Sequence, residues 1–238
     1  MEILQFKKAN CKNCYKCVRY CPVKAIRVHH HQAQIVESDC ILCGNCISVC
    51  PQNAKEVRSD LDRARALLRS GERIIASVAP SYIANFPVSS FAAFAPVLHR
   101  LGFYEARETA EGAFLVKSEY ERLVNERGQK LIISSCCPTV NSLIQKYYPQ
   151  TSGYLAPVLS PMQTHAKLLK EEFPGCRVVF IGPCISKKEE CVQLGSYTDL
   201  ALTFEELGEW LEMENIAFPK PVTLAQNGIP SLPQTKPA

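Results

Sequence analysis

Eight cysteines near the start of the chain form two copies of one spacing pattern. Each copy reads Cys-x-x-Cys-x-x-Cys-x-x-x-Cys-Pro, and every position of the first copy recurs 29 residues later, as Cys11 does at Cys40. The full set is Cys11, Cys14, Cys17, Cys21, Cys40, Cys43, Cys46 and Cys50. This spacing is typical of thiolates that hold a pair of 4Fe-4S clusters, which carry single electrons. The pattern therefore predicts an electron-transfer protein with two 4Fe-4S clusters.

The two sets of ligands are expected to interleave. In proteins with this pattern, the fourth cysteine of each copy binds the other cluster. The first cluster site is therefore expected to consist of Cys11, Cys14, Cys17 and Cys50. The second cluster site is expected to consist of Cys40, Cys43, Cys46 and Cys21. Pro22 and Pro51 turn the chain away after each copy, and Gly44 lets the backbone approach the cluster.

Composition limits the class of protein. The 238 residues carry 27 basic and 23 acidic side chains, a net charge of +4, which is too small to favour a nucleic-acid partner. No uncharged apolar run reaches the roughly 18 residues of a membrane span, and the N-terminus does not resemble a secretory signal. Thirteen cysteines without an export signal favour metal ligation over disulfides. We expect a cytoplasmic protein from an anaerobic organism.

Three segments are predicted from the hydrophobic pattern. Residues 1–57 are expected to form an α+β ferredoxin-like module around the two clusters, and residues 218–238 a proline-rich tail. Residues 58–217 are expected to form an α/β domain that opens with a helix at 58–70. Its strands are predicted at 73–78, 103–106, 130–134, 177–181 and 200–203. Its helices are predicted at 91–100, 112–125, 162–173 and 204–214, the last capped by Thr203 with Glu206 three residues on. Continuous apolar strands that alternate with helices are typical of a parallel sheet.

Unusual residues follow three of the predicted strands. Ala79-Pro80-Ser81 follows the first, Ser135-Cys136-Cys137-Pro138 follows another, and Gly182-Pro183-Cys184 follows a third. In parallel sheets, ligands bind beyond the carboxyl ends of the strands. Cys136 and Cys137 alone are best explained as small buried thiols. Adding Cys184 at a second strand end favours a metal site, because thiolates from several strand ends can converge there.

These motifs together resemble the iron-only ([FeFe]) hydrogenase family. Ser134-Ser135-Cys136-Cys137-Pro138 is similar to its Thr-Ser-Cys-Cys-Pro motif, and residues 183–190 (PCISKKEE) are similar to its Pro-Cys-x-x-Lys-x-x-Glu motif. Ala79-Pro80-Ser81 and Ser160-Pro161-Met162 match two further segments of the family's active-site pocket. The resemblance covers roughly residues 1–213. It implies a two-cluster ferredoxin-like module followed by a hydrogenase-type catalytic domain.

The resemblance also implies a role for each matching residue. Cys137 and Cys184 would bind a third 4Fe-4S cluster, which carries a diiron subsite in the family. Cys136 would move a proton to or from that subsite. Lys187 would donate a hydrogen bond to one of its cyanide ligands, and Ser81 would contact another. Pro80 and Met162 would line the pocket, and Glu190 would anchor the loop.

Three departures from the family motifs stand out. Ser134 replaces the usual threonine, and Gly182 replaces the usual methionine before Pro-Cys. The family completes its active-site cluster with two cysteines in a late Cys-x-x-x-Cys segment, whereas no cysteine follows Cys191 here. Cys137 and Cys184 supply only two of four ligands. We therefore expect an incomplete catalytic domain, as a fragment, a split gene or a degenerate relative.

Two hypotheses about function follow. In the first, the two clusters relay electrons to a hydrogenase-type site that interconverts protons and hydrogen, with a soluble, ferredoxin-like electron carrier or a partner subunit. In the second, the protein is a non-catalytic relative that serves electron transfer, sensing or iron–sulfur assembly. Lys187, Cys136 and Ser81 favour the first, since they would serve the diiron subsite. The missing late cysteines favour the second.

The remaining candidates have simpler explanations. His29, His30 and His31 lie between the two cysteine copies, where we expect an exposed loop tip. His99 and His165 are isolated on predicted helices and are expected to be structural.

Overall fold

The computed structural model describes residues 3–126 and 130–219 of the chain. All but the first two residues of the predicted proline-rich tail therefore lie outside the described residues. None of the helices in the described part is long and apolar enough to span a membrane.

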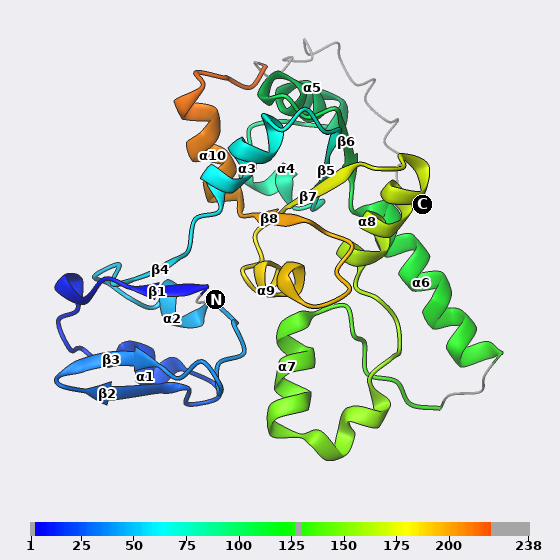
Figure 1. Cartoon of the computed structure of the whole chain (residues 1–238). Coiled ribbons are helices and arrows are strands. Elements are labelled where there is room, and N and C mark those ends of the chain that lie inside the picture. The colour runs from blue at the N-terminus through cyan, green and yellow to red at the C-terminus, as the bar shows by residue number, and fades with distance from the viewer. Residues whose placement is uncertain (1–2, 127–129, 220–238) are drawn as a thin grey trace, which may run out of the picture.

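Residues 3–57 form a small lobe at one side of the molecule (Figure 1). Its elements are β1 (Leu4–Phe6), η1 (Lys8–Asn10), α1 (Lys16–Tyr20), β2 (Ile26–His29), β3 (Gln32–Ile35), α2 (Asn45–Ser48) and β4 (Lys55–Val57). β1 pairs with β4 and β2 with β3, both antiparallel. Short apolar side chains and cysteines share one core here. His30 and His31 lie at the tip of the β2–β3 hairpin, exposed as expected.

The rest of the described chain forms an α/β domain. Its strands are β5 (Ile74–Val78), β6 (Glu105–Glu108), β7 (Arg177–Ile181) and β8 (Leu200–Leu202). Its helices are α3 (Leu61–Leu68), α4 (Tyr82–Asn85), α5 (Phe91–Leu101), α6 (Ala110–Asn125), α7 (Pro138–Tyr147), η2 (Pro149–Tyr154), α8 (Pro161–Glu172), α9 (Ser186–Val192) and α10 (Phe204–Met213). The strand order is β6-β5-β7-β8 and all pairings are parallel. The predicted parallel sheet is confirmed.

The sheet is buried on both faces. Ile74 and Val78 of β5 face a core that α3, α5 and α10 complete with Leu61, Phe94 and Trp210. Ile75, between them in sequence, faces the opposite side and packs with residues of α8. Because both faces are covered, β5 is apolar at almost every position. Phe218, near the end of the described chain, also packs on the first core, with its ring centroid 5.2 Å from that of Phe86.

The strand predicted at 130–134 is wrong. Only Ile133 makes a β-bridge, to Leu155, and Leu131 is 61% exposed. The apolar run therefore crosses the surface as a loop and does not enter the sheet. As a result, Cys136 and Cys137 do not follow a sheet strand; they precede α7, whose first residue is Pro138. Proline suits this position because the first helical turn leaves its N–H groups unbonded in any case.

Helices α6 and α8 approach so closely at Gly112 that no side chain fits between them. A Cβ atom on Gly112 would overlap the carbonyl oxygen of Pro161 and lie 2.8 Å from the backbone nitrogen of His165. We expect Gly112→Ala to destabilise the protein by about 2 kcal/mol, because the gain in helix propensity is smaller than the cost of separating the helices. Thermal denaturation measures this.

Gly153→Ala is the matched control, because no atom lies within 4 Å of a Cβ at that position. Equal melting temperatures for the Gly112→Ala and Gly153→Ala proteins would contradict the close packing of α6 on α8.

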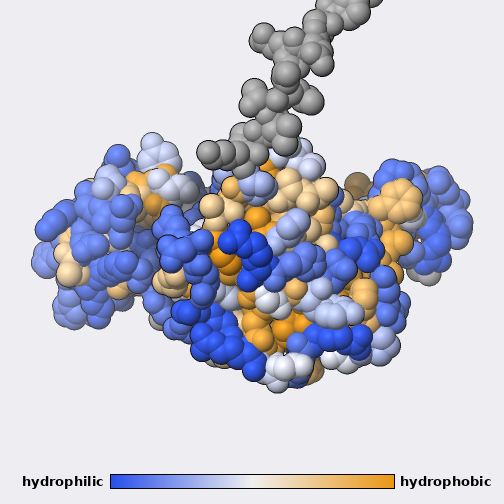
Figure 2. Space-filling model, turned by 90° about the horizontal axis from the view of Figure 1, so that it is seen from above, coloured by the Kyte–Doolittle hydropathy of each residue, from blue (hydrophilic) through white to orange (hydrophobic). Residues whose placement is uncertain are grey.

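Figure 2 shows hydrophobic surface over the middle of the molecule, with mainly hydrophilic surface on either side of it. Exposed apolar surface of this kind is typical of a face that contacts another chain or domain.

Candidate metal centres

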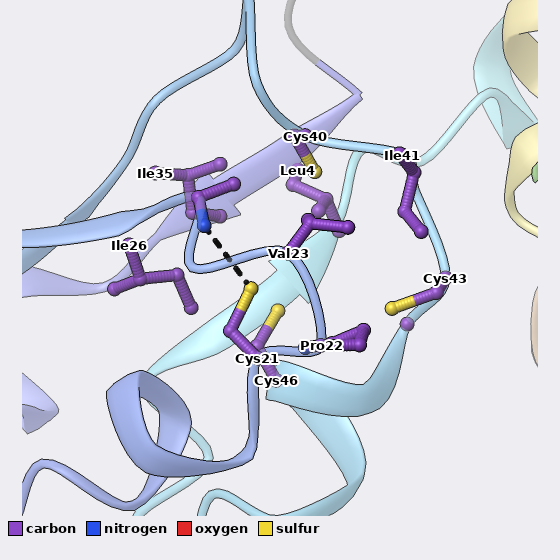
Figure 3. Close-up of a pocket in the computed structure, with 12 residues that line it drawn as sticks. Leu4, Cys21, Pro22, Val23, Ile26, Ile35, Cys40, Ile41, Cys43 and Cys46 are labelled. Atoms are coloured by element: carbon purple, nitrogen blue, oxygen red, sulfur yellow. Dashed lines mark hydrogen bonds between the residues drawn. The ribbon is translucent and has the colours of Figure 1, made fainter. Parts of the chain in front are cut away.

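Four cysteine side chains surround one cavity in the small lobe (Figure 3). Cys21, Cys40, Cys43 and Cys46 line it, together with Leu4, Ile26 and Ile35. They are the four cysteines of the expected second cluster site, so the structure brings that set together from both copies of the pattern. The apolar lining makes the site poorly accessible to water.

Backbone N–H groups point at the cysteine sulfurs. Ala25 donates to Cys21 Sγ at 3.3 Å, and Ala54, at the same place in the second copy, donates to Cys50 Sγ at 3.4 Å. Leu42 donates to Cys40 Sγ at 3.4 Å. Such bonds stabilise thiolates and tune the potential of a cluster that they hold.

The repeat extends to the backbone conformation. Positive φ angles occur at matching positions of both copies, which are Asn13 and Leu42, Tyr15 and Gly44, and Lys24 and Asn53. Five of these six are not glycine, and left-handed backbone is unfavourable for them. The cysteine loops are therefore held in one specific shape, which turns N–H groups inward.

The expected first cluster cysteines lie in the same lobe. Cys17 is buried, Cys11 and Cys50 are half-buried, and Cys14 is exposed. Cys14 Sγ lies 3.5 Å from Gln52 Oε1. Within residues 3–126 and 130–219, no three His, Cys, Asp or Glu side chains converge on a single metal ion. Four cysteines are the ligand set of a 4Fe-4S cluster, so the side chains around the cavity fit that group.

Burial raises the pKa of the Cys46 thiol to about 12, although the charge of Lys55 opposes the shift. Thiols must lose their protons to bind iron, so loading of this site releases protons.

The second constellation lies where β7 leads into α9. Cys184 follows the carboxyl end of β7, and its Sγ lies 3.0 Å from Ser186 Oγ. Lys187 is 8% exposed; its Nζ lies 2.6 Å from Glu190 Oε2 and 3.4 Å from the carbonyl oxygen of Cys136. The structure therefore brings Cys136, Lys187 and Glu190 together.

Other residues expected at this site lie on neighbouring elements: Ala79 donates to the carbonyl oxygen of Ile181 at 2.8 Å, so the loop after β5 leaves the sheet beside the loop after β7. Pro80 and Ser81 are exposed after β5, and the Ser81 hydroxyl forms no hydrogen bond with any described residue. Met162 is 1% exposed and packs with Phe180 and Ala201. The ring of Phe180 also occupies the space beside Gly182, where a Cβ atom would lie 2.7 Å from it. The ring of Phe180 thus fills the space that a side chain at position 182, such as the family's methionine, would need.

A buried charge network that the sequence pattern does not indicate lies behind the Cys184 loop. Lys188 Nζ donates to Asp60 Oδ2 at 2.9 Å and to Glu206 Oε1 at 2.8 Å, and all three residues are at most 6% exposed. Burial raises the pKa of Asp60, but bonds from Lys188, Arg63 and Arg58 outweigh it and hold the pKa below its ordinary value. Only the cap formed by Thr203 and Glu206 was signalled by the sequence, and it is confirmed.

The small lobe and the α/β domain are joined beside the second cluster site. At the end of α7, Lys146 Nζ donates to the carbonyl oxygen of Cys40 at 2.6 Å, and the Tyr147 hydroxyl donates to that of Asp39 at 2.7 Å. Cys43 and Cys184 line the same groove between the lobes. Helix α7 thus begins after Cys137 and ends beside the Cys40 loop. The loop that carries Cys184 lines the groove between the small lobe and the α/β domain.

A second buried polar network lies between β5, α6 and α8. His165 is fully buried; its Nδ1 lies 2.8 Å from Ser77 Oγ, and its Nε2 has no hydrogen-bond partner in the described structure. The nearest carboxylate oxygen is Glu111 Oε2, at 3.9 Å. Burial lowers the pKa of His165 to about 4, although Glu111 opposes the shift. This burial is consistent with the structural role that the sequence predicts for His165.

Acid should therefore weaken the fold between pH 6.5 and 4. The unfolded chain binds a proton at His165 near pH 6.5, whereas the folded chain resists protonation down to about pH 4. Stability is complete above pH 6.5 and falls by about 3 kcal/mol as the pH approaches 4. Urea titrations across this range should show a shallower pH slope for His165→Gln. His29→Gln, on the exposed hairpin, should keep the original slope; identical slopes for both variants would refute this assignment.

Comparison with known proteins agrees with this geometry. Residues 3–51 match the sequence profile of the "4Fe-4S dicluster domain", which with the cysteine-lined cavity defines an iron–sulfur protein. Residues 72–229 match that of the "Iron only hydrogenase large subunit, C-terminal domain". The chain therefore belongs to the iron-only hydrogenase family, and the resemblance seen in its motifs is confirmed.

Curated relatives cover most of this chain. It is 30% identical to the periplasmic [Fe] hydrogenase large subunit of Nitratidesulfovibrio vulgaris over 92% of its own length and 60% of that protein. It is 27% identical to the NADP-reducing hydrogenase subunit HndD of Solidesulfovibrio fructosivorans, over 87% of its own length and 36% of that protein. A cytosolic Fe-S cluster assembly factor, NAR1 of Encephalitozoon cuniculi, is 27% identical over 56% of the chain. The chain thus spans roughly a third to three fifths of these relatives.

Proposed function

We propose that the protein relays electrons through two 4Fe-4S clusters to a hydrogenase-type site at Cys137 and Cys184. The observation that carries this proposal is the cavity lined by Cys21, Cys40, Cys43 and Cys46, because it lies beside the groove that Cys184 also lines. Electrons move between centres only over short distances. Helix α7 also links the two sites, because it begins after Cys137 and its Lys146 donates to the carbonyl oxygen of Cys40.

At the hydrogenase-type site, this chain would supply half of a cluster's ligands and the surrounding polar groups. A cluster with a diiron subsite, when bound, supplies the interconversion of protons and hydrogen. Lys187 is held by Glu190 and the Cys136 carbonyl, so its ammonium can donate to an anionic ligand. The Cys136 thiol, which accepts from Ser134 Oγ at 3.1 Å, would move the proton. Ser81, Pro80 and Met162 would complete the pocket from the end of β5, which adjoins β7, and from α8.

A second candidate function is non-catalytic. The similarity to a protein named as an Fe-S cluster assembly factor favours it. In that case, Cys137 and Cys184 would serve electron transfer, sensing or cluster assembly without turnover of hydrogen.

The electron partner would be a soluble, acidic, ferredoxin-like carrier or a partner subunit, in a reducing cytoplasm. Lys12, Lys16 and Arg19 are exposed around the cysteines of the first cluster site, on the side of the lobe that carries α1. Opposite charges on a carrier would steer it to that side.

Two measurements on anaerobically reconstituted protein test the proposal. Two clusters require about eight iron atoms per chain, and Cys43→Ala should lower that content. Infrared bands from carbonyl and cyanide ligands, after maturation, would support a diiron subsite and the enzymatic function. Eight irons without such bands would support the non-catalytic function, and fewer than four irons would refute both.

A further inference from the structure

The positive charge of the small lobe is concentrated around the first copy of the cysteine pattern. Residues 3–36 contain seven lysine and arginine residues and no aspartate or glutamate. Residues 37–57, which hold the second copy, contain three acidic residues and one basic residue. Lys12, Lys16 and Arg19 are exposed, and their side chains form no ion pair with any residue that the structure describes. Their charge is therefore available to a partner of opposite charge.

A tyrosine in left-handed backbone stands beside these cations. Tyr15, the residue before α1, has a φ of 54°, and the matching position of the second copy is Gly44, with a φ of 77°. This conformation is unfavourable for tyrosine but not for glycine. The Tyr15 side chain is 39% exposed, so core packing does not compensate for the strain. Strain of this kind is typical of residues that contact another molecule.

A groove leads from this surface to a cysteine of the first cluster site. It lies between α1 and the end of α2, and its lining includes Lys16, Tyr20, Val49 and Cys50. Tyr20 is 58% exposed, and Cys50 is half-buried. Tyrosine and arginine are enriched at protein interfaces, because an aromatic ring gives apolar contact while its hydroxyl stays hydrated. The groove therefore combines an apolar contact, positive charge and access to an expected cluster ligand.

The first cluster site is not attached to the α/β domain, whereas the second is. Lys146 and Tyr147 hold the loop of the second site, and a Cβ atom on Gly44 would lie 3.6 Å from the Ile185 side chain. Among the residues that the structure describes, no hydrogen bond or ion pair joins α1 to the α/β domain. The surface around α1 is thus the side of the small lobe that an external protein can reach.

We propose, on the basis of the proposed function, that Tyr15, Lys16, Arg19 and Tyr20 form the docking surface for a small acidic one-electron carrier protein. Acidic side chains of the carrier pair with Lys16 and Arg19, and Tyr20 packs against an apolar patch on it. In each encounter the carrier loses one electron and the first cluster gains it, with no bond made or broken. A polyanion would meet the same charges, but a groove that ends at Cys50 favours a redox protein.

A plant-type 2Fe-2S ferredoxin, which is a small acidic protein, serves as the probe on the reconstituted full chain. Calorimetric titration measures its affinity, and stopped-flow absorbance measures electron transfer from its reduced form. Tyr20→Ala should lower both the affinity and the second-order rate constant about tenfold, and Tyr20→Phe should keep most of each. Lys16→Glu should lower the rate at low salt and reduce its dependence on ionic strength.

Two control variants lie on the α/β domain. Tyr104→Ala removes a tyrosine of similar exposure, 54%, and Lys167→Glu changes the net charge as Lys16→Glu does. Both should keep the affinity and the rate. Tyr15→Gly installs the residue of the second copy and should weaken ferredoxin binding while raising the melting temperature, because it removes the contact together with the strain. Unchanged binding by Tyr15→Gly would overturn the assignment of Tyr15 to the surface.

Dithionite, a small reductant that needs no docking surface, separates this inference from the proposed function. If it reduces fewer than two clusters in the unchanged protein, the proposed function fails. If it reduces both clusters in every variant, but Tyr20→Ala and Lys16→Glu behave like the two controls, the docking inference is overturned while the electron-transfer function stands. An effect of Lys16→Glu without one of Tyr20→Ala would indicate a general anion-binding patch and would overturn the inference as well.

Discussion

Removal of iron is expected to unfold residues 3–57 while the parallel sheet stays folded. The described elements of the small lobe have three to five residues each, and its core combines a few apolar side chains with Cys17, Cys21 and Cys46. A lobe of this size buries too little apolar surface to fold alone, so cluster binding supplies much of its stability. The α/β domain has an extensive apolar core of its own.

Hydrogen exchange measured by mass spectrometry checks this result. In iron-free protein, the amides of Ala25, Leu42 and Ala54, which donate to cysteine sulfurs, should exchange roughly a hundredfold faster or more. Peptides from β5 and β7 should keep their protection and serve as the internal control. Equal protection of the small lobe with and without iron would show that its fold does not depend on clusters.

Lys188→Met should cost about 3 kcal/mol of stability. The substitution leaves Glu206 buried as a carboxylate with only the N–H groups of Asp60 and Thr203, at 2.5 and 2.6 Å, as partners. Removing one member of a buried charge network is strongly destabilising for this reason. Chemical denaturation gives the difference in the free energy of unfolding. The Cys184 loop should also become more susceptible to proteolysis, because Lys188 lies in α9, the helix that directly follows this loop.

Two further variants isolate the cause. Lys167→Met removes a solvent-exposed lysine whose partner is Glu171, and it should change stability by less than about 1 kcal/mol. Glu206→Gln combined with Lys188→Met should recover part of the loss, since it removes the unpaired charge. A Lys188→Met protein as stable as the Lys167→Met protein would contradict a structural role for the network.

The sequence predicted those features that depend on local pattern. The cysteine repeat identified the set around the cavity, because ligand spacing follows from cluster geometry. The strands at 74–78 and 177–181 were predicted closely, because burial on both faces makes them apolar throughout. The cap at Thr203 was predicted because its two bonds lie within four residues.

Features that depend on tertiary contacts were not predictable. Residues 130–134 are as apolar as a strand, yet the segment has no neighbouring strand besides the single bridge to Leu155. The charge network joins Asp60 to Lys188 and Glu206, which lie more than a hundred residues away in sequence. The residues near Asp60 in the sequence do not indicate that Lys188, from so distant a helix, is buried beside it.

The attachment of α7 to the small lobe determines how this protein can exchange electrons with others. Lys146 and Tyr147 donate to the carbonyl oxygens of Cys40 and Asp39. Lys188 donates to Asp60, in the segment that follows the small lobe. The small lobe is therefore attached to the α/β domain at two places. It cannot swing between sites as a tethered carrier does. A redox partner must therefore diffuse to the small lobe. The distance that an electron covers from the small lobe to the Cys184 loop is then the same in every encounter.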